Sequence, residues 1–168
     1  MSAPQESASS RDRRVLVLGL GNTILSDDGV GIYAVRRVRE LLEPAEPIDV
    51  VEAELAGFAL LDLLEGYRAC VIVDAVEWPD LVPGELRQLG LSDFAPTARL
   101  AAGHQIDLPT ALELGKTLQR PMPAKVVIVA VQVEDPRLLA EHCTAAVAGA
   151  IEPAAKLAIK LARELIGA

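Results

Sequence analysis

The chain has 168 residues, of which 51% are hydrophobic and only 3% aromatic, and it carries a formal net charge of -8. This length predicts one domain with an aliphatic core, as is typical of helices packed on a parallel sheet. The acidic balance excludes nucleic acid and anionic membranes as partners, since both need basic surfaces, and no apolar run is long enough for membrane insertion.

The first 13 residues are polar and rich in Ser, without hydrophobic periodicity, which predicts a disordered tail ahead of a single α/β domain over residues 14–168. Arg13 and Arg14 precede VLVLGLG and imitate an export signal. However, that apolar run is short and leads to Asp27 and Asp28 instead of a small-residue cleavage site. We therefore predict a first strand here and a cytoplasmic protein.

Hydrophobic patterning predicts strands and helices in alternation along the rest of the chain. Such alternation indicates a three-layer α/β/α sandwich around a mostly parallel, twisted, five-stranded sheet with one antiparallel edge strand. The last helix is expected to be interrupted near Pro153. The expected strands are 15–20, 48–53, 69–76, 85–89 (the antiparallel edge) and 125–133, and the expected helices are 30–42, 57–64, 107–118 and 143–166.

The stretch 15–31, VLVLGLGNTILSDDGVG, is an apolar strand that leads through a glycine turn into a helix. Ligands of open parallel sheets bind at such turns. A dinucleotide fingerprint would need a third glycine where Ile24 stands, and the pair Asp27 and Asp28 would repel a phosphate. The turn therefore favours a cation over an anion.

Metal-competent side chains follow two strands and precede one helix. Asp28 comes after the first strand, Asp74 lies near the end of the third, and His104 stands in the loop AAGHQID. Because the carboxyl ends of parallel strands meet at one sheet edge, these groups are expected near one another. Two carboxylates and an imidazole suit a divalent transition metal.

Each of these residues also has a structural explanation. Asp27 or Asp28 could cap the following helix, Asp74 could belong to a buried hydrogen-bond network, and His104 could be structural. Spacing alone leaves both interpretations open. The remaining histidine and the two cysteines favour plainer roles: His142 at the surface or a helix start, and Cys70 and Cys143 as buried thiols.

Five motifs in order, GLGNTILSDDGVG, VEAELAGFALLDLL, VIVDAV, PGELR and AAGHQIDLPTALELG, resemble those of the hydrogenase maturation endopeptidases. The resemblance spans about residues 15–160. Members of this family remove a C-terminal extension from the large-subunit precursor of nickel–iron hydrogenases. By motif position, the resemblance implies that Asp28, Asp74 and His104 are both the metal-contacting and the catalytic residues. The chain departs from the family at Gly103, where Ser or Thr is frequent, and at the helix start Cys143-Thr144.

The resemblance implies that the metal is the nickel of the loaded precursor, not a permanently bound cofactor. That nickel could polarise the scissile carbonyl or activate water, or a carboxylate could act as general base while the metal serves recognition. The sequence has no G-x-S-x-G motif to indicate a serine nucleophile. Two alternatives remain: a non-catalytic nickel-binding maturation chaperone, and a self-contained metallohydrolase of the same fold.

Overall fold

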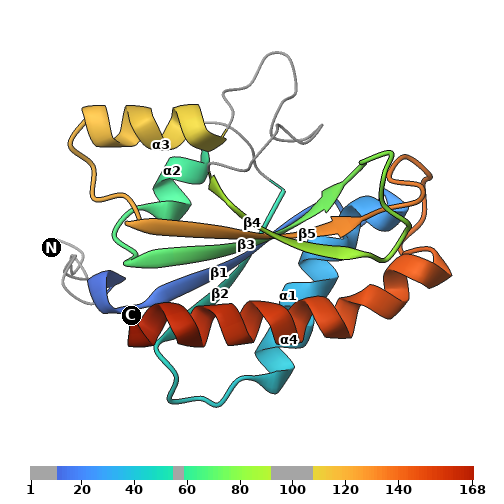
Figure 1. The fold of residues 1–168 in the computed structure, drawn as a ribbon, viewed down its shortest axis with the longest axis horizontal. Coiled ribbons are helices and arrows are strands. Elements are labelled where there is room, and N and C mark those ends of the chain that lie inside the picture. Colours follow the sequence, from blue (N-terminus) through green and yellow to red (C-terminus); the bar gives the residue numbers. More distant parts are fainter. Residues whose placement is uncertain (1–10, 55–58, 92–107) are drawn as a thin grey trace, which may run out of the picture.

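The computed structural model describes residues 11–54, 59–91 and 108–168. Within them, helices cover both faces of one five-stranded sheet, so the three-layer prediction is confirmed (Figure 1). The strands are β1 (Val15–Leu20), β2 (Ile48–Ala53), β3 (Ala69–Val76), β4 (Leu86–Gly90) and β5 (Lys125–Gln132). The α-helices are α1 (Val30–Leu41), α2 (Ala59–Leu64), α3 (Leu108–Thr117) and α4 (Ala145–Gly167), and the 3-10 helices are η1 (Arg11–Arg13) and η2 (Ser26–Gly29).

The sheet has the order β2-β1-β3-β5-β4. The first four strands in that order run parallel, and β4 pairs with β5 in the antiparallel direction. This pairing confirms the predicted antiparallel edge. Since β1 connects to β2 on one side and has β3 on its other side, the chain changes direction across the sheet between β1 and β3, where open α/β sheets place their ligands.

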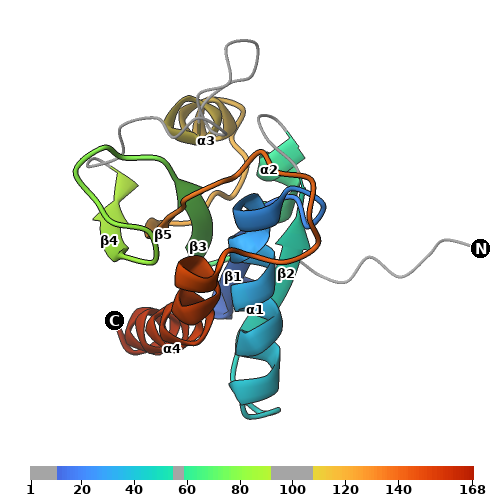
Figure 2. The same ribbon diagram turned by 90° about the vertical axis from the view of Figure 1, so that its right-hand side faces the viewer.

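Strand periodicity explains the two cores. Alternate residues of β1 point to opposite faces, and all of them are buried, because helices cover both sides. Val15 and Val17 pack into the layer of α1 and α4, whereas Leu16 and Leu18 pack into the layer of α2 and α3. Figure 2 shows these two helical layers on opposite sides of the sheet.

The start of α1 lies unusually close to the sheet at Gly31. A Cβ at this position would stand 2.2 Å from the Leu20 carbonyl oxygen and 2.4 Å from the Val73 carbonyl oxygen. Only glycine fits such an approach to backbone atoms. The first turn of α1 is therefore fixed against the carboxyl ends of β1 and β3.

The expected interruption of the last helix is wrong, because α4 runs continuously through Pro153. Proline removes one helical hydrogen bond, but here it lies on the exposed side of the helix. Buried residues on both sides of it, such as Ala150 and Ala154, pack against the same core. Tertiary packing of one apolar stripe therefore keeps the helix whole.

Several predicted segments include residues outside the described ranges. These are residues 1–10 of the expected tail, the starts of the helices expected at 57 and at 107, and the loop AAGHQID with His104. The last three residues of the expected tail form η1. Within the part of the chain that the structure describes, no helix combines the length and apolar character needed to span a bilayer.

Candidate functional site

Asp74 lies in the sheet itself, near the carboxyl end of β3 and in register with Ala130 of β5. Its side chain is fully buried. Oδ1 accepts a hydrogen bond from the Ala75 backbone N–H at 2.9 Å. A carboxylate enclosed among apolar strands is costly unless the surroundings supply polar partners or a cation. Its burial at the carboxyl end of a central strand makes Asp74 a candidate functional residue.

Asp28 reaches the same edge on η2, a short 3-10 helix that the sequence patterns did not predict. The Asp28 backbone N–H donates to the Leu25 carbonyl at 2.9 Å, which closes the turn. Glycine at position 21 permits this turn to pack closely, since a Cβ at Gly21 would stand 2.4 Å from the Asp28 carbonyl oxygen. η2 packs beside β3, and the Asp28 side chain is half-buried. The structure thus places Asp28 and Asp74 at one sheet edge, at the switch between β1 and β3.

The third predicted ligand, His104, lies outside the described residues. Among residues 11–54, 59–91 and 108–168, no three His, Cys, Asp or Glu side chains gather closely enough to hold a metal ion. The predicted triad therefore stays a prediction, with two of its members placed.

Asp27 has a structural role that differs from the role expected of Asp28. Its fully buried carboxylate accepts four hydrogen bonds. The backbone N–H groups of Glu134 and Asp135 donate to Oδ2 at 3.0 and 2.9 Å, and Thr144 donates from both its N–H and its hydroxyl. A carboxylate has about four acceptor sites, so this side chain is committed to structure. It caps neither η2 nor α1 and instead joins the turn after β1 to the chain after β5.

Further contacts join the same two segments, which we call the β1–α1 loop (residues 21–29) and the β5–α4 loop (residues 133–144). The Ser26 N–H donates to the Ala140 carbonyl at 2.8 Å, and the Ser26 hydroxyl donates to the His142 carbonyl at 3.1 Å. These bonds hold Ser26 at a φ of 37°, a left-handed conformation that costs about 1–2 kcal/mol in a non-glycine residue. In Figure 2, the orange β5–α4 loop runs beside the blue start of α1.

Tyr33 of α1 contacts both loops through its hydroxyl group. Its hydroxyl oxygen lies 2.9 Å from the Glu141 carbonyl oxygen and 3.3 Å from that of Thr23. Burial raises the pKa of this hydroxyl, so it stays a neutral donor at physiological pH. The β5–α4 loop is therefore one wall of the site, a role that no sequence motif indicated.

The cysteines are poor nucleophiles. Burial raises the pKa of the Cys70 thiol well above its ordinary range. Burial, followed by the nearby negative charge of Asp27, raises the pKa of Cys143 to about 11. Since only the thiolate attacks a carbonyl efficiently, neither cysteine fits nucleophilic catalysis.

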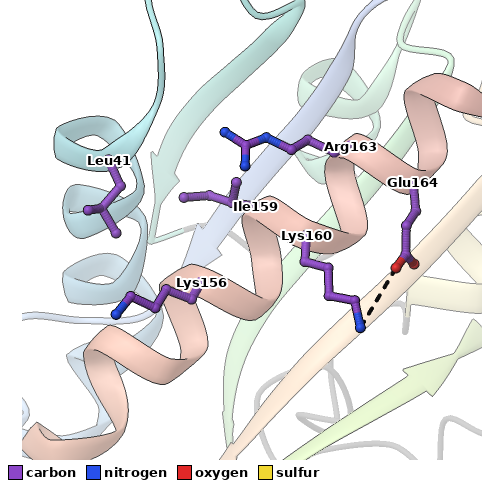
Figure 3. A pocket seen from close by; sticks show the side chains of 6 residues that line it. All are labelled: Leu41, Lys156, Ile159, Lys160, Arg163 and Glu164. Atoms are coloured by element: carbon purple, nitrogen blue, oxygen red, sulfur yellow. Dashed lines mark ion pairs between the residues drawn. The ribbon is translucent and has the colours of Figure 1, made fainter.

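A large surface pocket lies elsewhere, between the end of α1 and the second half of α4 (Figure 3). It has a volume of about 620 Å³ and an apolar floor that includes Leu41 and Ile159. Each of its three cationic side chains already pairs with an acid: Lys156 with Glu152, Lys160 with Glu164, and Arg163 with Glu46. The pocket therefore offers little net charge to an anionic ligand, and it lacks both candidate carboxylates.

Comparison with known sequences identifies relatives along most of the chain. The model of a family described as hydrogenase maturation protease matches residues 32–161. The hydrogenase 2 maturation protease of Escherichia coli is 27% identical over 154 residues, which cover 90% of this chain and 92% of that protein. The hydrogenase expression/formation protein HupD of Bradyrhizobium diazoefficiens is 28% identical over 159 residues, which cover 93% of this chain and 81% of that protein.

Solved structures agree with the sequence comparison. The hydrogenase maturating endopeptidase HybD from E. coli superimposes with a TM-score of 0.75 at 26% identity, covering 90% of this chain and 93% of that one. An endopeptidase from E. coli determined in solution has a TM-score of 0.71 at 28% identity, with the same coverage. The mixed five-stranded fold is therefore one that solved endopeptidases adopt.

Proposed function

This chain belongs to the hydrogenase maturation protease family and is an endopeptidase of that type, and we propose that it removes the C-terminal extension from the nickel-loaded large-subunit precursor of a nickel–iron hydrogenase. The observation that supports the proposal is the packing of η2, which carries Asp28, beside β3, which carries the buried Asp74, at the switch between β1 and β3. Carboxylate oxygens at this edge would face a cation that the substrate brings. A cytoplasmic location remains part of the proposal, as the sequence predicts.

The proposed role of the site is to contact the nickel of the precursor. Asp28 and Asp74 would supply carboxylate oxygens, and His104 an imidazole nitrogen, a donor set that suits a divalent transition metal. Nickel is then part of the substrate, so cleavage waits until the precursor has been loaded. His104 enters this proposal on the sequence alone.

The rigidity around the two acids supports this role. Asp27 and Ser26, which precede Asp28 directly, are bound to the β5–α4 loop by hydrogen bonds from several backbone groups. A recognition group held by its neighbours needs little reorganisation when the metal arrives. Asp28 is thus presented on a turn whose backbone is fixed on both sides.

The chemistry itself is the hydrolysis of one amide bond. A water oxygen bonds to the scissile carbonyl carbon, the C–N bond breaks, and the leaving amine nitrogen takes up a proton. Two carboxylates and the substrate's nickel are enough for this reaction, either through a general base or through a polarised carbonyl. The raised thiol pKa values argue against a cysteine acyl-enzyme.

The test is processing of purified precursor by the wild-type chain, with and without nickel in the precursor. We expect one cut near the C-terminus of the loaded form and no cut in the nickel-free form. Mass spectrometry would show the cut as a loss of mass from the precursor and as a released peptide of the same mass as that loss. Equal processing of both forms would remove the sensing role. Binding of the precursor without shortening would instead indicate a chaperone, and turnover of simple peptides with stoichiometric metal in the purified chain would indicate a self-contained metallohydrolase.

A further inference from the structure

Three large apolar side chains stand exposed on the two loops that wall the site. Ile24 is 52% exposed, Leu138 53% and Leu139 78%. A parallel bridge joins Leu25 to Ala140, with the Ala140 N–H donating to the Ile24 carbonyl at 3.2 Å. Ile24 and Leu139 each directly precede a residue of this bridged pair, so they stand on adjoining segments. We call Ile24, Leu138 and Leu139 the apolar rim.

The apolar rim is held in place by its own backbone. The Asn22 side-chain oxygen accepts a hydrogen bond from the Ile24 N–H at 3.1 Å. On the other loop, Asp135 Oδ1 accepts from the N–H groups of Arg137 and Leu138 at 3.1 and 3.0 Å. Ordered apolar side chains lose little backbone freedom when a partner covers them, which favours binding.

The rim lies next to the candidate site. Ile24 and Asp28 are four residues apart in one compact turn, so their Cα atoms are separated by no more than about 14 Å. A polypeptide segment docked on the rim would therefore bring neighbouring parts of the same protein to Asp28. The other strongly exposed apolar residues described, Val82 and Leu118, stand on other elements and make no comparable pair.

The charged residues around the rim indicate what charge a binding partner should carry. Glu134 and Glu141 are exposed on the β5–α4 loop, and Asp28 follows on the other loop. The nearby Arg137 is committed to Glu77 through two hydrogen bonds of 2.9 and 2.8 Å. This acidic surrounding favours a partner segment with Lys or Arg beside its apolar side chains.

We propose that the apolar rim is the docking surface for the hydrogenase precursor, and that it takes an apolar surface segment of the precursor flanked by basic residues. The inference rests on the proposed function, since it names how that same substrate is held. Three apolar side chains make a small contact, and small interfaces give weak, transient binding, which suits an enzyme that must release its product. The rim determines which precursor binds, while Asp28 and Asp74 contact the nickel and so distinguish a loaded precursor from an unloaded one.

The test compares two double variants for precursor binding and cleavage. Ile24→Ser with Leu139→Ser removes two of the three apolar side chains of the rim, and Val82→Ser with Leu118→Ser is the matched control, because all four side chains are exposed. The rim variant is expected to weaken the Kd for the nickel-free precursor and to raise the KM for the loaded one about tenfold, with kcat within about twofold. The control variant should change neither quantity by more than about twofold.

Several outcomes would overturn the docking role. These are an unchanged Kd and KM in the rim variant, a fall in kcat at constant KM, and no measurable binding of either precursor form by the wild-type chain. Sedimentation velocity gives another: a wild-type dimer that the rim substitutions dissociate would make the rim a contact between copies of this chain. Failure of the wild-type chain to cleave the loaded precursor would contradict the proposed function. The docking role of the rim is tested separately, by the ratio of the Kd of the rim variant to that of the wild-type chain for the nickel-free precursor.

Salt dependence tests the charge argument. Higher ionic strength should weaken wild-type binding of the precursor, because it screens acidic residues from basic ones. Glu134→Gln with Glu141→Gln should weaken binding at low salt and flatten this dependence. Binding that strengthens with salt in the wild-type chain would contradict a basic partner segment.

Discussion

Asp27 accepts two hydrogen bonds from a single residue, Thr144, whose backbone N–H lies 2.7 Å from Oδ1 and whose hydroxyl lies 3.0 Å from Oδ2. The two residues are 117 positions apart in the chain. Thr144 stands directly before α4, so this contact ties the first turn of the domain to the start of its last helix. The turn that carries Asp28 is therefore joined to the start of α4.

Substitution of Asp27 is expected to be costly. Asp27→Ala would leave three partly buried backbone N–H groups and one hydroxyl without their acceptor, which should lower the free energy of unfolding by about 3 kcal/mol. Thr144→Val removes only the hydroxyl bond and should cost about 1 kcal/mol. Urea unfolding measures both. An Asp27→Ala chain as stable as wild type would show that the two loops do not need this link.

Gly31 and Gly149 form a matched pair for testing the contact between α1 and the sheet. Gly31→Ala would force a Cβ against the Leu20 and Val73 carbonyl oxygens and should destabilise the chain by about 2 kcal/mol or more. Gly149 is exposed on α4 and has no atom within 4 Å of an added Cβ, so Gly149→Ala should be neutral or stabilise by up to about 1 kcal/mol. Thermal unfolding of the two variants gives the comparison. Equal effects would contradict the close approach at Gly31.

Acid should weaken the domain in part through Asp49. The hydrogen bond from Arg14 holds the pKa of Asp49 below its ordinary value of 3.8, against the opposing effect of burial. A carboxyl whose folded pKa is lowered stabilises the fold above its ordinary pKa and loses that contribution as pH falls through the folded value. Asp49→Asn should therefore be less stable than wild type at neutral pH, and the gap should close below about pH 3.8. A gap that is constant down to the acid transition would show that the ion pair contributes nothing.

Both thiols should be silent in the folded protein. With the pKa of Cys143 raised to about 11, about one molecule in a thousand carries that thiolate at pH 8, and buried Cys70 ionises still less. Iodoacetamide should therefore modify neither cysteine in the native chain and should leave endopeptidase activity intact. Rapid alkylation that abolishes cleavage in step with modification would indicate a cysteine nucleophile.

The centre of the sheet could be predicted from sequence because β1, β3 and β5 are nearly continuous apolar runs. β1, β2 and β3 begin and end where the patterns placed them, since glycine, proline and charged residues bound them clearly. The predicted interruption of α4 at Pro153 is wrong, because the local backbone preference of proline is weaker than the packing of a long apolar stripe. The antiparallel edge followed from a weak strand after a Pro-Gly turn.

From residue chemistry alone, the sequence singles out Asp74 most clearly among the site residues. Asp74 stands out in sequence because a carboxylate inside VIVDAV is costly unless it serves a purpose. The division of labour between Asp27 and Asp28 could not be read in the same way. Adjacent identical residues look alike in sequence, and the donors that occupy Asp27 come from a segment more than a hundred positions away.

The most direct measurement is the initial rate of cleavage of nickel-loaded precursor by three single variants and two matched controls. Asp28→Asn, Asp74→Asn and His104→Ala should each slow cleavage by at least about a hundredfold, because each removes a proposed nickel contact. Asp62→Asn, at an exposed side chain of α2, and His142→Ala, at the other histidine of the chain, should stay within about twofold of wild type. Full activity in all three site variants would contradict the assignment of this sheet edge as the place where the enzyme meets its substrate's nickel.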